Sequence, residues 1–258
     1  MTTPLVIIPT YQEAAMVQET LLRVRASVPE ADILVVDDAS PDGTAELAEA
    51  VGTAVGGVFV RRRAGKDGLG RAYAEGFRWG LARGYDVLIE MDADGSHDAG
   101  AVPRLLDRCE EGTDLAIGSR YVFGGSIPDW SWHRRVLSRF GNVYASALLG
   151  LGVRDATSGF RAYRASALQR LNLQLVRSGG YCFQIEMTYR AARAGATIAE
   201  VPIAFVDRAE GESKMSPGIV AEALWQVSRW GAARMFSSPD LPDLAADPCG
   251  RHHELAAH

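Results

Sequence analysis

Leu5-Val6-Ile7-Ile8-Pro9 is a short, wholly apolar run that ends in a proline, and it predicts a β-strand. The polar residues that follow, up to Glu13, predict a loop. Residues 13–27 then carry apolar side chains at helical spacing, which predicts a helix. The first part of the chain is therefore expected to be a strand, a loop and a helix, in that order.

The same pattern returns three more times along the chain. Apolar runs at 33–36, 58–60 and 87–91 predict strands, and each is followed by a helical pattern, at 44–51, 71–83 and 102–110. A further strand is expected at 115–117. Strands that alternate with helices at this spacing predict an α/β fold, with a doubly wound, mainly parallel sheet and helices on both faces.

The second half of the chain has a less regular pattern. After a loop rich in Gly, Pro and Trp, we expect a helix at 134–151, a strand at 160–163, helices at 166–171 and 183–194, strands at 197–201 and near Phe205, and an amphipathic helix at 219–236. Residues 237–258, with many Pro, Asp and small residues, are expected to form a disordered tail.

The length of 258 residues favours one compact domain with a short appendage over two independent domains. We expect this domain to span 1–236, with a nucleotide-binding half at about 1–118, an acceptor half at about 119–218 and the helix 219–236. The composition, with 47% hydrophobic and 23% charged residues, is that of a globular protein. It argues against a polytopic membrane protein.

Charge and cysteine content narrow the classes of function. There are 27 Lys and Arg against 32 Asp and Glu, so the net charge of -5 offers no basic surface for nucleic acid. The three cysteines are widely spaced and without a CxxC pair, which argues against a disulfide framework or a zinc site. No apolar run approaches the ~18–20 residues of a spanning helix, and no signal peptide is recognisable. A cytoplasmic protein is expected.

Acidic residues follow two of the predicted strands, and polar residues follow a third. Asp37-Asp38 ends one strand, Asp92-Ala93-Asp94 follows another, and Thr10 to Glu13 follows the first. Loops at the carboxyl ends of parallel strands converge on one rim, where ligands bind. Each acidic residue alone could be a helix cap or a solvated loop residue. Together, they indicate a divalent cation that also binds a diphosphate.

Other phosphate-binding patterns are absent. No G-x-G-x-x-G follows the first strand, and Gly65-Lys66 lacks the remaining residues of a P-loop. No G-x-S-x-G elbow occurs, and His97 and His133 lie in different segments, so a Ser-His-Asp hydrolase has little support. A dehydrogenase and a P-loop NTPase are likewise disfavoured.

Seven blocks of residues, in order over about residues 4–236, resemble the dolichol- or polyprenol-phosphate mannosyltransferases of the GT-A, family 2 glycosyltransferases. The blocks are Pro9-Thr10-Tyr11-Gln12-Glu13, Val36-Asp37-Asp38-Ala39-Ser40-Pro41-Asp42-Gly43-Thr44, Lys66-Asp67-Gly68-Leu69-Gly70, Met91-Asp92-Ala93-Asp94, Gly118-Ser119-Arg120-Tyr121, Asp155-Ala156-Thr157-Ser158-Gly159-Phe160-Arg161, and Phe205-Val206-Asp207-Arg208 with Gly211-Glu212-Ser213-Lys214.

The resemblance implies an inverting transfer of mannose from GDP-mannose to polyprenyl (dolichyl) phosphate, with Mg²⁺ or Mn²⁺ as cofactor. It also implies peripheral contact with the cytosolic face of the membrane, either directly or through a separate membrane protein. By analogy with the family, the nucleotide sugar would be held by Pro9, Tyr11, Glu13, Val36, Asp37, Asp38, Lys66, Asp92, Ala93, Asp94, Arg120, Arg208 and Lys214.

Five residues are expected to be catalytic, and two of them, Arg134 and Ser138, lie in a helix that resembles the family's R-x-x-x-S segment. Asp92 and Asp94 would hold the metal, and Arg120, Arg134 and Ser138 would hold the acceptor phosphate. Arg134 and Ser138 are four residues apart and hence on one face of a helix. Without the resemblance, Arg134 would be interpreted as a solvated helix residue.

The chain departs from the family directly after Asp94. The family usually continues with Leu, Ser or Gln, His and Pro, whereas this chain reads Gly95-Ser96-His97-Asp98. Ser96 could approach the metal where some relatives have glutamine, and Gly95 is expected to loosen the loop.

The chemistry supports the same reaction without reference to the family. An alcohol acceptor needs a general base, but a phosphate monoester has a second pKa near ~6 and is largely dianionic at pH 7. The remaining requirement is to bring two anionic phosphates together, which calls for a metal on one and arginines on the other.

Other functions stay open at this point. The same fold could use another sugar nucleotide, such as UDP-glucose, or a soluble acceptor. A sugar-nucleotide pyrophosphorylase would need a Gly-rich loop after the first strand, which is absent. A binding module without catalysis is the remaining alternative.

The helix 219–236 has two possible roles. It could lie in the membrane interface, with Trp225 or Trp230 at the headgroups and Arg229 and Arg234 near anionic lipids. It could equally cover the core of its own domain, and lipid access would then come from a partner or from the loop 127–132.

Overall fold

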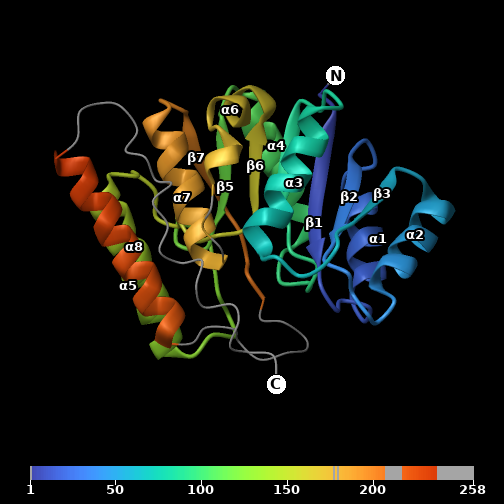
Figure 1. The fold of residues 1–258 in the computed structure, drawn as a ribbon, viewed down its shortest axis with the longest axis horizontal. Helices are drawn as coiled ribbons and strands as arrows, with labels where there is room; N and C mark the ends of the chain where they lie inside the picture. Colours follow the sequence, from blue (N-terminus) through green and yellow to red (C-terminus); the bar gives the residue numbers. More distant parts are fainter. Residues whose placement is uncertain (1, 177, 179, 207–216, 237–258) are drawn as a thin grey trace.

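A computed structural model of the protein describes residues 2–176, 178, 180–206 and 217–236 (Figure 1). Its strands are β1 (Pro4–Thr10), β2 (Asp32–Asp37), β3 (Val58–Arg62), β4 (Val87–Glu90), β5 (Leu115–Ser119), β6 (Arg161–Arg164) and β7 (Ile198–Pro202). Its helices are α1 (Val17–Ser27), α2 (Thr44–Val55), α3 (Leu69–Leu81), α4 (Val102–Glu110), α5 (Trp132–Leu149), α6 (Ala165–Arg170), α7 (Gly180–Arg193) and α8 (Pro217–Phe236), with short 3₁₀ helices η1 (Ala99–Ala101) and η2 (Leu173–Leu175).

Within the described residues, the strands form one seven-stranded sheet in the order β3-β2-β1-β4-β6-β5-β7. Strand β1 is parallel to β2 and β4, β2 is parallel to β3, and β5 is parallel to β7. Only β6 among these runs the other way, antiparallel to both β4 and β5. The predicted α/β fold with a mainly parallel sheet is confirmed.

The sheet is buried on both faces, which explains the wholly apolar first strand. Leu5 and Ile7 point into a core shared with α3, α6, α7, α8 and part of α5. Val6 and Ile8 point into a second core, which α1, α2 and α4 cover. Figure 1 shows these two helical layers, with α3, α6 and α7 in front of the sheet.

Helix α3 approaches the sheet closely because two of its residues lack a side chain. A Cβ atom at Gly76 would lie 2.5 Å from Ile7 Cγ2, and one at Gly80 would lie 2.6 Å from Leu88 Cδ2. Such distances are shorter than any normal van der Waals contact, so these positions require glycine. The close packing fixes the beginning of α3 beside the ends of β1 and β4.

The segment around Phe205 differs from the expectation. The predicted strand there is wrong, because residues 203–206 make only isolated bridges, between His97 and Phe205 and between Ser126 and Ala204. Its neighbours are loops, so no ladder can extend along it. The predicted tail, 237–258, lies outside the described residues.

Helix α8 packs beside α5, as Figure 1 shows on the left of the molecule. The Tyr144 hydroxyl and Ser228 Oγ are 2.7 Å apart across this contact. Trp230 is 1% exposed and stacks with Tyr189 at 6.3 Å between centroids. The placement of Trp230 at lipid headgroups is therefore wrong, and the core-packing alternative applies to it. Trp225 is half exposed.

Candidate active site

The predicted functional loops meet at one edge of the sheet. They follow the carboxyl ends of β1, β2, β4 and β5, which point the same way. Because β6 is antiparallel, the loop 155–160 that enters it joins the same edge. Gly159 thus lies beside Asp92, with 3.8 Å between Asp92 Oδ2 and a Cβ atom built at Gly159. The structure confirms this convergence.

Asp37 connects the first two loops of this edge. One of its carboxylate oxygens accepts hydrogen bonds from Thr10 Oγ1 at 2.8 Å and from Ser40 Oγ at 2.6 Å. The other oxygen accepts from the Ser40 N–H at 2.9 Å. Ser40 Oγ in turn accepts from the Gln12 N–H at 3.0 Å. This part of the structure shows Asp37 organising the loops, and a direct contact with the nucleoside stays a prediction.

Asp38 is linked to the loop that carries Lys66. Its carboxylate pairs with Arg63, and it accepts the Asp67 N–H at 3.3 Å. The Lys66 Nζ lies 4.1 Å from the centroid of the Tyr11 ring, a cation–π contact. The structure therefore brings Tyr11, Asp38 and Lys66 to one place, and their role in nucleotide binding stays a prediction.

The other residues predicted to bind the nucleotide lie partly in strands, partly in loops and partly outside the described residues. Pro9 lies in β1, and Val36 is a buried residue of β2. The Glu13 N–H donates to Thr44 Oγ1 at 3.0 Å, which holds the two loops together. Arg208 and Lys214 lie outside the described residues.

Asp92 is held at the end of β4 by two neighbours. Its Oδ1 accepts a hydrogen bond from the Tyr73 hydroxyl at 3.2 Å. Its N–H donates to Nδ1 of the buried His97 at 3.1 Å. Burial and the Asp92 carboxylate raise the pKa of the Tyr73 hydroxyl well above its ordinary value, so Tyr73 keeps its proton and remains a donor.

Asp94, Gly95 and Ser96 form a tight turn directly after Ala93 in the chain. Asp94 Oδ1 accepts the Ser96 N–H at 3.0 Å. Gly95 between them has a φ of 76°, and a Cβ there would lie 3.1 Å from Met16 Cε. Glycine adopts this φ without strain, whereas a residue with a side chain would be strained there, so the turn suits Gly95. That Gly95 loosens the loop stays a prediction.

The donor atoms of this turn fit Mg²⁺ or Mn²⁺. Ser96 Oγ is buried and has no hydrogen-bond partner in the described part of the chain, and the N–H of the same residue donates to the Asp94 carboxylate. Two carboxylates and one hydroxyl are hard oxygen ligands, and Mg²⁺ is usually held by one or two carboxylates plus substrate phosphates. Among the described residues, no group of three or more His, Cys, Asp or Glu could hold a metal by itself.

A buried polar cluster lies directly beneath Asp92, and the sequence analysis missed it. Gln184 Nε2 donates to Glu90 Oε2 at 2.8 Å, and the fully buried Arg161 donates to the Gln184 carbonyl at 2.9 Å. Burial raises the pKa of Glu90 to about 8. The available signal was a glutamate at the end of an otherwise apolar strand.

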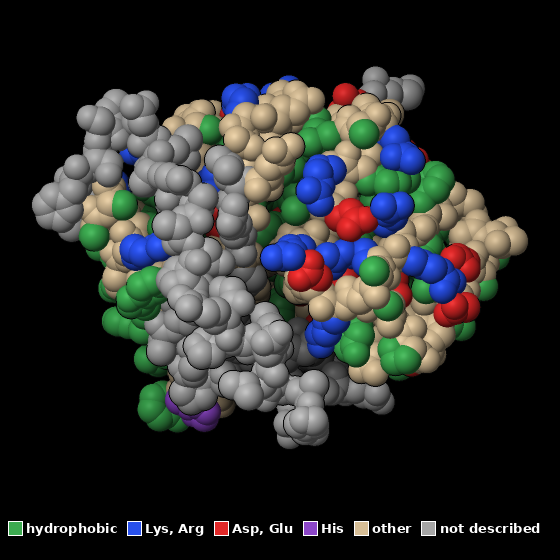
Figure 2. Space-filling view, viewed as in Figure 1, with side chains coloured by type: hydrophobic (Ala, Val, Ile, Leu, Met, Phe, Trp, Pro, Cys, Tyr) green, Lys and Arg blue, Asp and Glu red, His purple; other side chains and the backbone are tan. Residues whose placement is uncertain are grey.

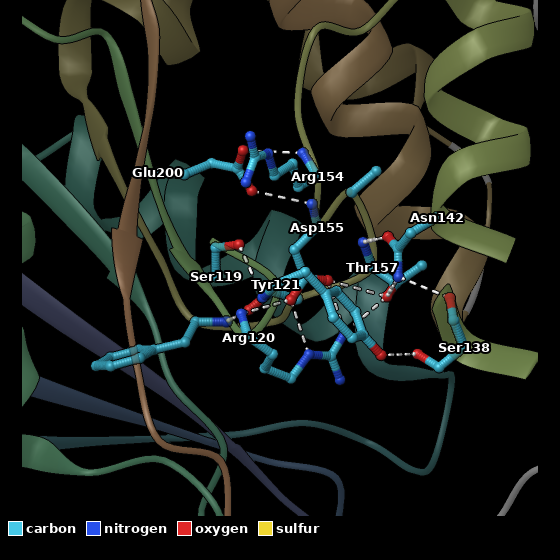
Figure 3. A network of polar contacts seen from close by, with 12 residues as sticks. Ser119, Arg120, Tyr121, Ser138, Asn142, Arg154, Asp155, Thr157 and Glu200 are labelled. Carbon is cyan, nitrogen blue, oxygen red and sulfur yellow. Dashed lines mark hydrogen bonds and ion pairs between the residues drawn. The ribbon is translucent and has the colours of Figure 1, made fainter. Parts of the chain in front are cut away.

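Arg120 is fixed by the fully buried carboxylate of Asp155 (Figure 3). Its Nε donates to Asp155 Oδ2 at 2.8 Å and its Nη2 to Oδ1 at 2.7 Å. Burial alone would raise the pKa of Asp155, but the Arg120 guanidinium and N–H donors outweigh it and hold this pKa below its ordinary value. Glu200 fixes the same loop by accepting the Asp155 N–H at 2.9 Å.

The Asp155 loop is also bonded to helix α5, as Figure 3 shows. Thr157 Oγ1 accepts from Arg120 Nη2 at 2.8 Å and from Asn142 Nδ2 at 3.1 Å. One turn earlier on α5, Ser138 Oγ accepts from the Tyr121 hydroxyl at 2.7 Å. Arg120 and Ser138 therefore belong to one hydrogen-bonded network.

Arg134 lies one turn before Ser138 on α5. Its guanidinium carbon is 3.9 Å from the centroid of the Trp130 ring, and that of Arg120 is 5.5 Å from the same centroid. The structure thus brings together Arg120, Arg134 and Ser138, and their role toward an acceptor phosphate stays a prediction.

Residues 5–171 match the family model described as glycosyl transferase family 2. The chain belongs to glycosyl transferase family 2. This glycosyltransferase is 54% identical over 229 residues to the undecaprenyl-phosphate mannosyltransferase of Micrococcus luteus, covering 89% of the chain and 94% of that protein. It is 51% identical over 228 residues to the polyprenol monophosphomannose synthase of Mycolicibacterium smegmatis, covering 88% of the chain and 86% of that protein. The predicted family is confirmed.

Solved structures confirm the GT-A type of fold. The mannosyltransferase PcManGT from Pyrobaculum calidifontis, in complex with GDP-Man and Mn²⁺, superposes with a TM-score of 0.60 at 17% identity, over 93% of this chain and 68% of that one. S. aureus TarS 1–349 in complex with UDP-GlcNAc superposes with a TM-score of 0.62 at 17% identity, over 92% and 68%. At this identity, the likeness concerns the fold alone.

Proposed function

We propose that this glycosyltransferase transfers mannose from GDP-mannose to polyprenyl phosphate, with inversion at the anomeric carbon. The observation that carries the proposal is the position of Arg134 and Ser138 on one helix, in a network with Arg120, at the edge of the sheet that also bears Asp92 and Asp94. Such an arrangement suits two phosphates that must approach each other. The names of the two relatives above support the choice of sugar and acceptor.

The donor would lie across the ends of β1, β2 and β4. Tyr11, Asp38 and Lys66 are grouped where a nucleoside would bind. Asp92, Asp94 and Ser96 would hold Mg²⁺ or Mn²⁺, which supplies positive charge to the leaving diphosphate when bound. Tyr73 keeps the Asp92 carboxylate oriented through its hydrogen bond of 3.2 Å.

The acceptor needs no general base from the protein. A phosphate monoester is largely dianionic at neutral pH, because its second pKa is near ~6. Its oxygen would attack the anomeric carbon from the side opposite the diphosphate, so that the new C–O bond forms as the bond to the diphosphate breaks. One such displacement inverts the configuration. Arg120 and Arg134 offset the repulsion between the two anions.

We also propose that helix α5 lies on the cytosolic membrane surface. Trp132, Val136, Phe140 and Val143 are spaced on one side of α5 and are 76%, 59%, 58% and 61% exposed. The opposite side carries Arg134, Ser138 and Asn142, which face the site. Figure 2 shows hydrophobic atoms along the left edge of the molecule, over α5. In the described residues, no helix is long and apolar enough to span a membrane.

This surface replaces Trp230 as the expected lipid contact. Phe140→Glu should lower co-sedimentation with vesicles of phosphatidylcholine and phosphatidylglycerol, because it places a charge in the apolar side of α5. Leu22→Glu on α1, at a half-exposed position in the other helical layer, is the matched control. Equal vesicle binding by the two variants would show that α5 does not contact lipid.

One experiment tests the reaction itself. The protein is incubated with GDP-mannose, UDP-glucose or other nucleotide sugars, with Mg²⁺, Mn²⁺ or EDTA, and with a short polyprenyl phosphate. Mass spectrometry of the lipid should find one added hexose with GDP-mannose and metal only. NMR coupling at the anomeric position reports the stereochemistry. Transfer from UDP-glucose alone, or to a soluble sugar alone, would overturn the proposal in favour of another family 2 activity.

A further inference from the structure

Trp130 has two guanidinium groups close to its ring. The guanidinium carbon of Arg134 is 3.9 Å from the ring centroid, and that of Arg120 is 5.5 Å from it. Trp130 is only 6% exposed, so these contacts are largely shielded from water. A cation is attracted by the electron-rich face of an aromatic ring, and the attraction is stronger when the pair is desolvated.

The indole N–H of Trp130 is not what holds this side chain. Its Nε1 is buried and has no hydrogen-bond partner within the residues that the structure describes. The backbone of the segment is fixed separately, because Arg135 donates to the Trp130 carbonyl at 2.8 Å and to the Pro128 carbonyl at 3.0 Å. The side chain therefore acts through its ring alone.

Aromatic contacts connect Trp130 to the predicted metal loop. The Phe205 ring packs edge-on against Trp130, with centroids 5.7 Å apart, and against His97, with centroids 5.6 Å apart. His97 accepts the Asp92 N–H at 3.1 Å. The Arg120 guanidinium carbon lies 5.5 Å from the Phe205 ring as well. One chain of rings thus extends from the arginines to the loop of Asp92.

We infer that Trp130 is a positioning residue that holds Arg120 and Arg134 for one shared phosphate. Two guanidinium groups held near one ring repel each other before a dianion binds, although the Asp155 carboxylate already balances part of the Arg120 charge. The ring of Trp130 attracts both and offsets part of this repulsion, so that the phosphate meets a preformed pair. This inference rests on the proposed function, since it assigns the phosphate to the lipid acceptor.

The first test removes the ring. Trp130→Leu should raise the KM for a short polyprenyl phosphate by about tenfold, the size expected for a desolvated cation–π contact. The affinity for GDP, measured by calorimetry, should stay within about twofold, because Tyr11, Asp38 and Lys66, the residues grouped where the nucleoside would bind, are on other loops. Trp79→Leu is the matched control: Arg83 lies 3.8 Å from the Trp79 ring, near the end of α3 farthest from the site. The KM of the Trp79→Leu variant for polyprenyl phosphate should not change.

The second test keeps the shape of the residue. Fluorinated tryptophans introduced at position 130 alone withdraw electron density from the ring, so the acceptor KM should rise with each added fluorine. In an Arg134→Ala background, Trp130→Leu should add less than about twofold, because the ring would have lost one of its two partners. An acceptor KM independent of fluorine content would overturn the inference, and this test applies even if Trp130→Leu does not fold. Fully multiplicative effects of the two substitutions in the double variant would also overturn it.

The acceptor's binding separates this inference from the proposed reaction. The same variants are compared for binding of a short polyprenyl phosphate by equilibrium dialysis without a sugar donor. If the wild type binds this phosphate but transfers no mannose, the proposed function fails and the Trp130 comparison still applies. If the wild type transfers mannose and the variants bind the phosphate equally well, only the inference about Trp130 fails.

Discussion

The nucleotide side and the acceptor side that we propose for the site meet at one edge of the same sheet, but they are held in different ways. On the nucleotide side, Asp37 and Asp38 share their hydrogen bonds among hydroxyls, N–H groups and one arginine on neighbouring loops. On the acceptor side, Arg120 depends on one fully buried carboxylate, Asp155, and on the rings around it.

This difference determines how each side should respond to the loss of one group. Where several polar groups share their hydrogen bonds, removing one group leaves other partners for the rest, so the loss has a modest effect on stability. A buried ion pair leaves an uncompensated charge when one member is removed, and that is costly. The acceptor side should therefore be the more sensitive of the two to single substitutions.

The largest expected effect is on stability. Asp155→Asn should lower the free energy of unfolding by about 3–5 kcal/mol, because it leaves the Arg120 charge buried with a neutral partner. Asp38→Asn on the nucleotide side should cost about 1–2 kcal/mol, since Arg63 keeps Glu75 at 3.1 Å as a second partner. Urea denaturation measures both. Equal losses would remove the contrast between the two sides.

The next effect concerns the proposed metal loop. Asp94→Asn should lower turnover at least ~100-fold while the protein stays folded, because a carboxylate proposed to hold the metal is lost. Asp98→Asn is a suitable control, since Asp98 is an exposed helix cap that accepts the Gly100 N–H at 2.9 Å. Near-normal, metal-dependent turnover by a folded Asp94→Asn variant would refute the metal assignment.

A smaller effect tests whether the two sides act separately. Arg134→Ala should raise the KM for polyprenyl phosphate by about tenfold and leave GDP affinity nearly unchanged. Ser138→Ala should have the same selectivity with a smaller effect, because Ser138 is neutral. Steady-state kinetics and calorimetry give the two values. Parallel losses of GDP binding and acceptor use would place this part of α5 at the donor or in general stability.

The last effect is a pH dependence beneath the proposed metal loop. The pKa of Glu90 is raised from 4.5 to about 8 by burial, so its favourable contribution to folding is fully present below about 4.5 and is lost as pH rises through about 8. Glu90→Gln mimics the protonated side chain. Its melting temperature should equal that of the wild type near pH 4.5 and exceed it increasingly toward pH 8. A constant difference between the two proteins would contradict this.

The elements that the sequence predicted well are those with local signals. Strand β1 and the helices α1 to α4 follow from apolar runs and helical spacing, and the Asp92 loop follows from its place after a buried strand. Ser138 and Arg134 share a helix face because of their spacing alone. These features depend on neighbours within a few residues.

The features that the sequence did not predict depend on contacts between distant segments. Trp230 follows the same helical pattern whether its side faces lipid or Tyr189, and only tertiary packing decides. Phe205 is β-like in composition but meets only loops. Asp155 and Trp130 gain their roles from Arg120, which lies 35 residues from Asp155 in sequence.

Strand β6 has a consequence for the order in which the chain folds. It fills the position between β4 and β5, and its register joins Val87 to Arg164 and Glu90 to Arg161. Strands β1 to β4 can pair as they leave the ribosome, whereas β5 and β7 join the sheet only once β6 is in place. The chain between the end of β4 at Glu90 and the start of β6 at Arg161 must close into a long loop. This closure is slow, because chain entropy is lost before the contacts form. The part of the sheet formed by β1 to β4 can therefore form first, and the pairing of Arg120 with Asp155 is completed when β6 inserts.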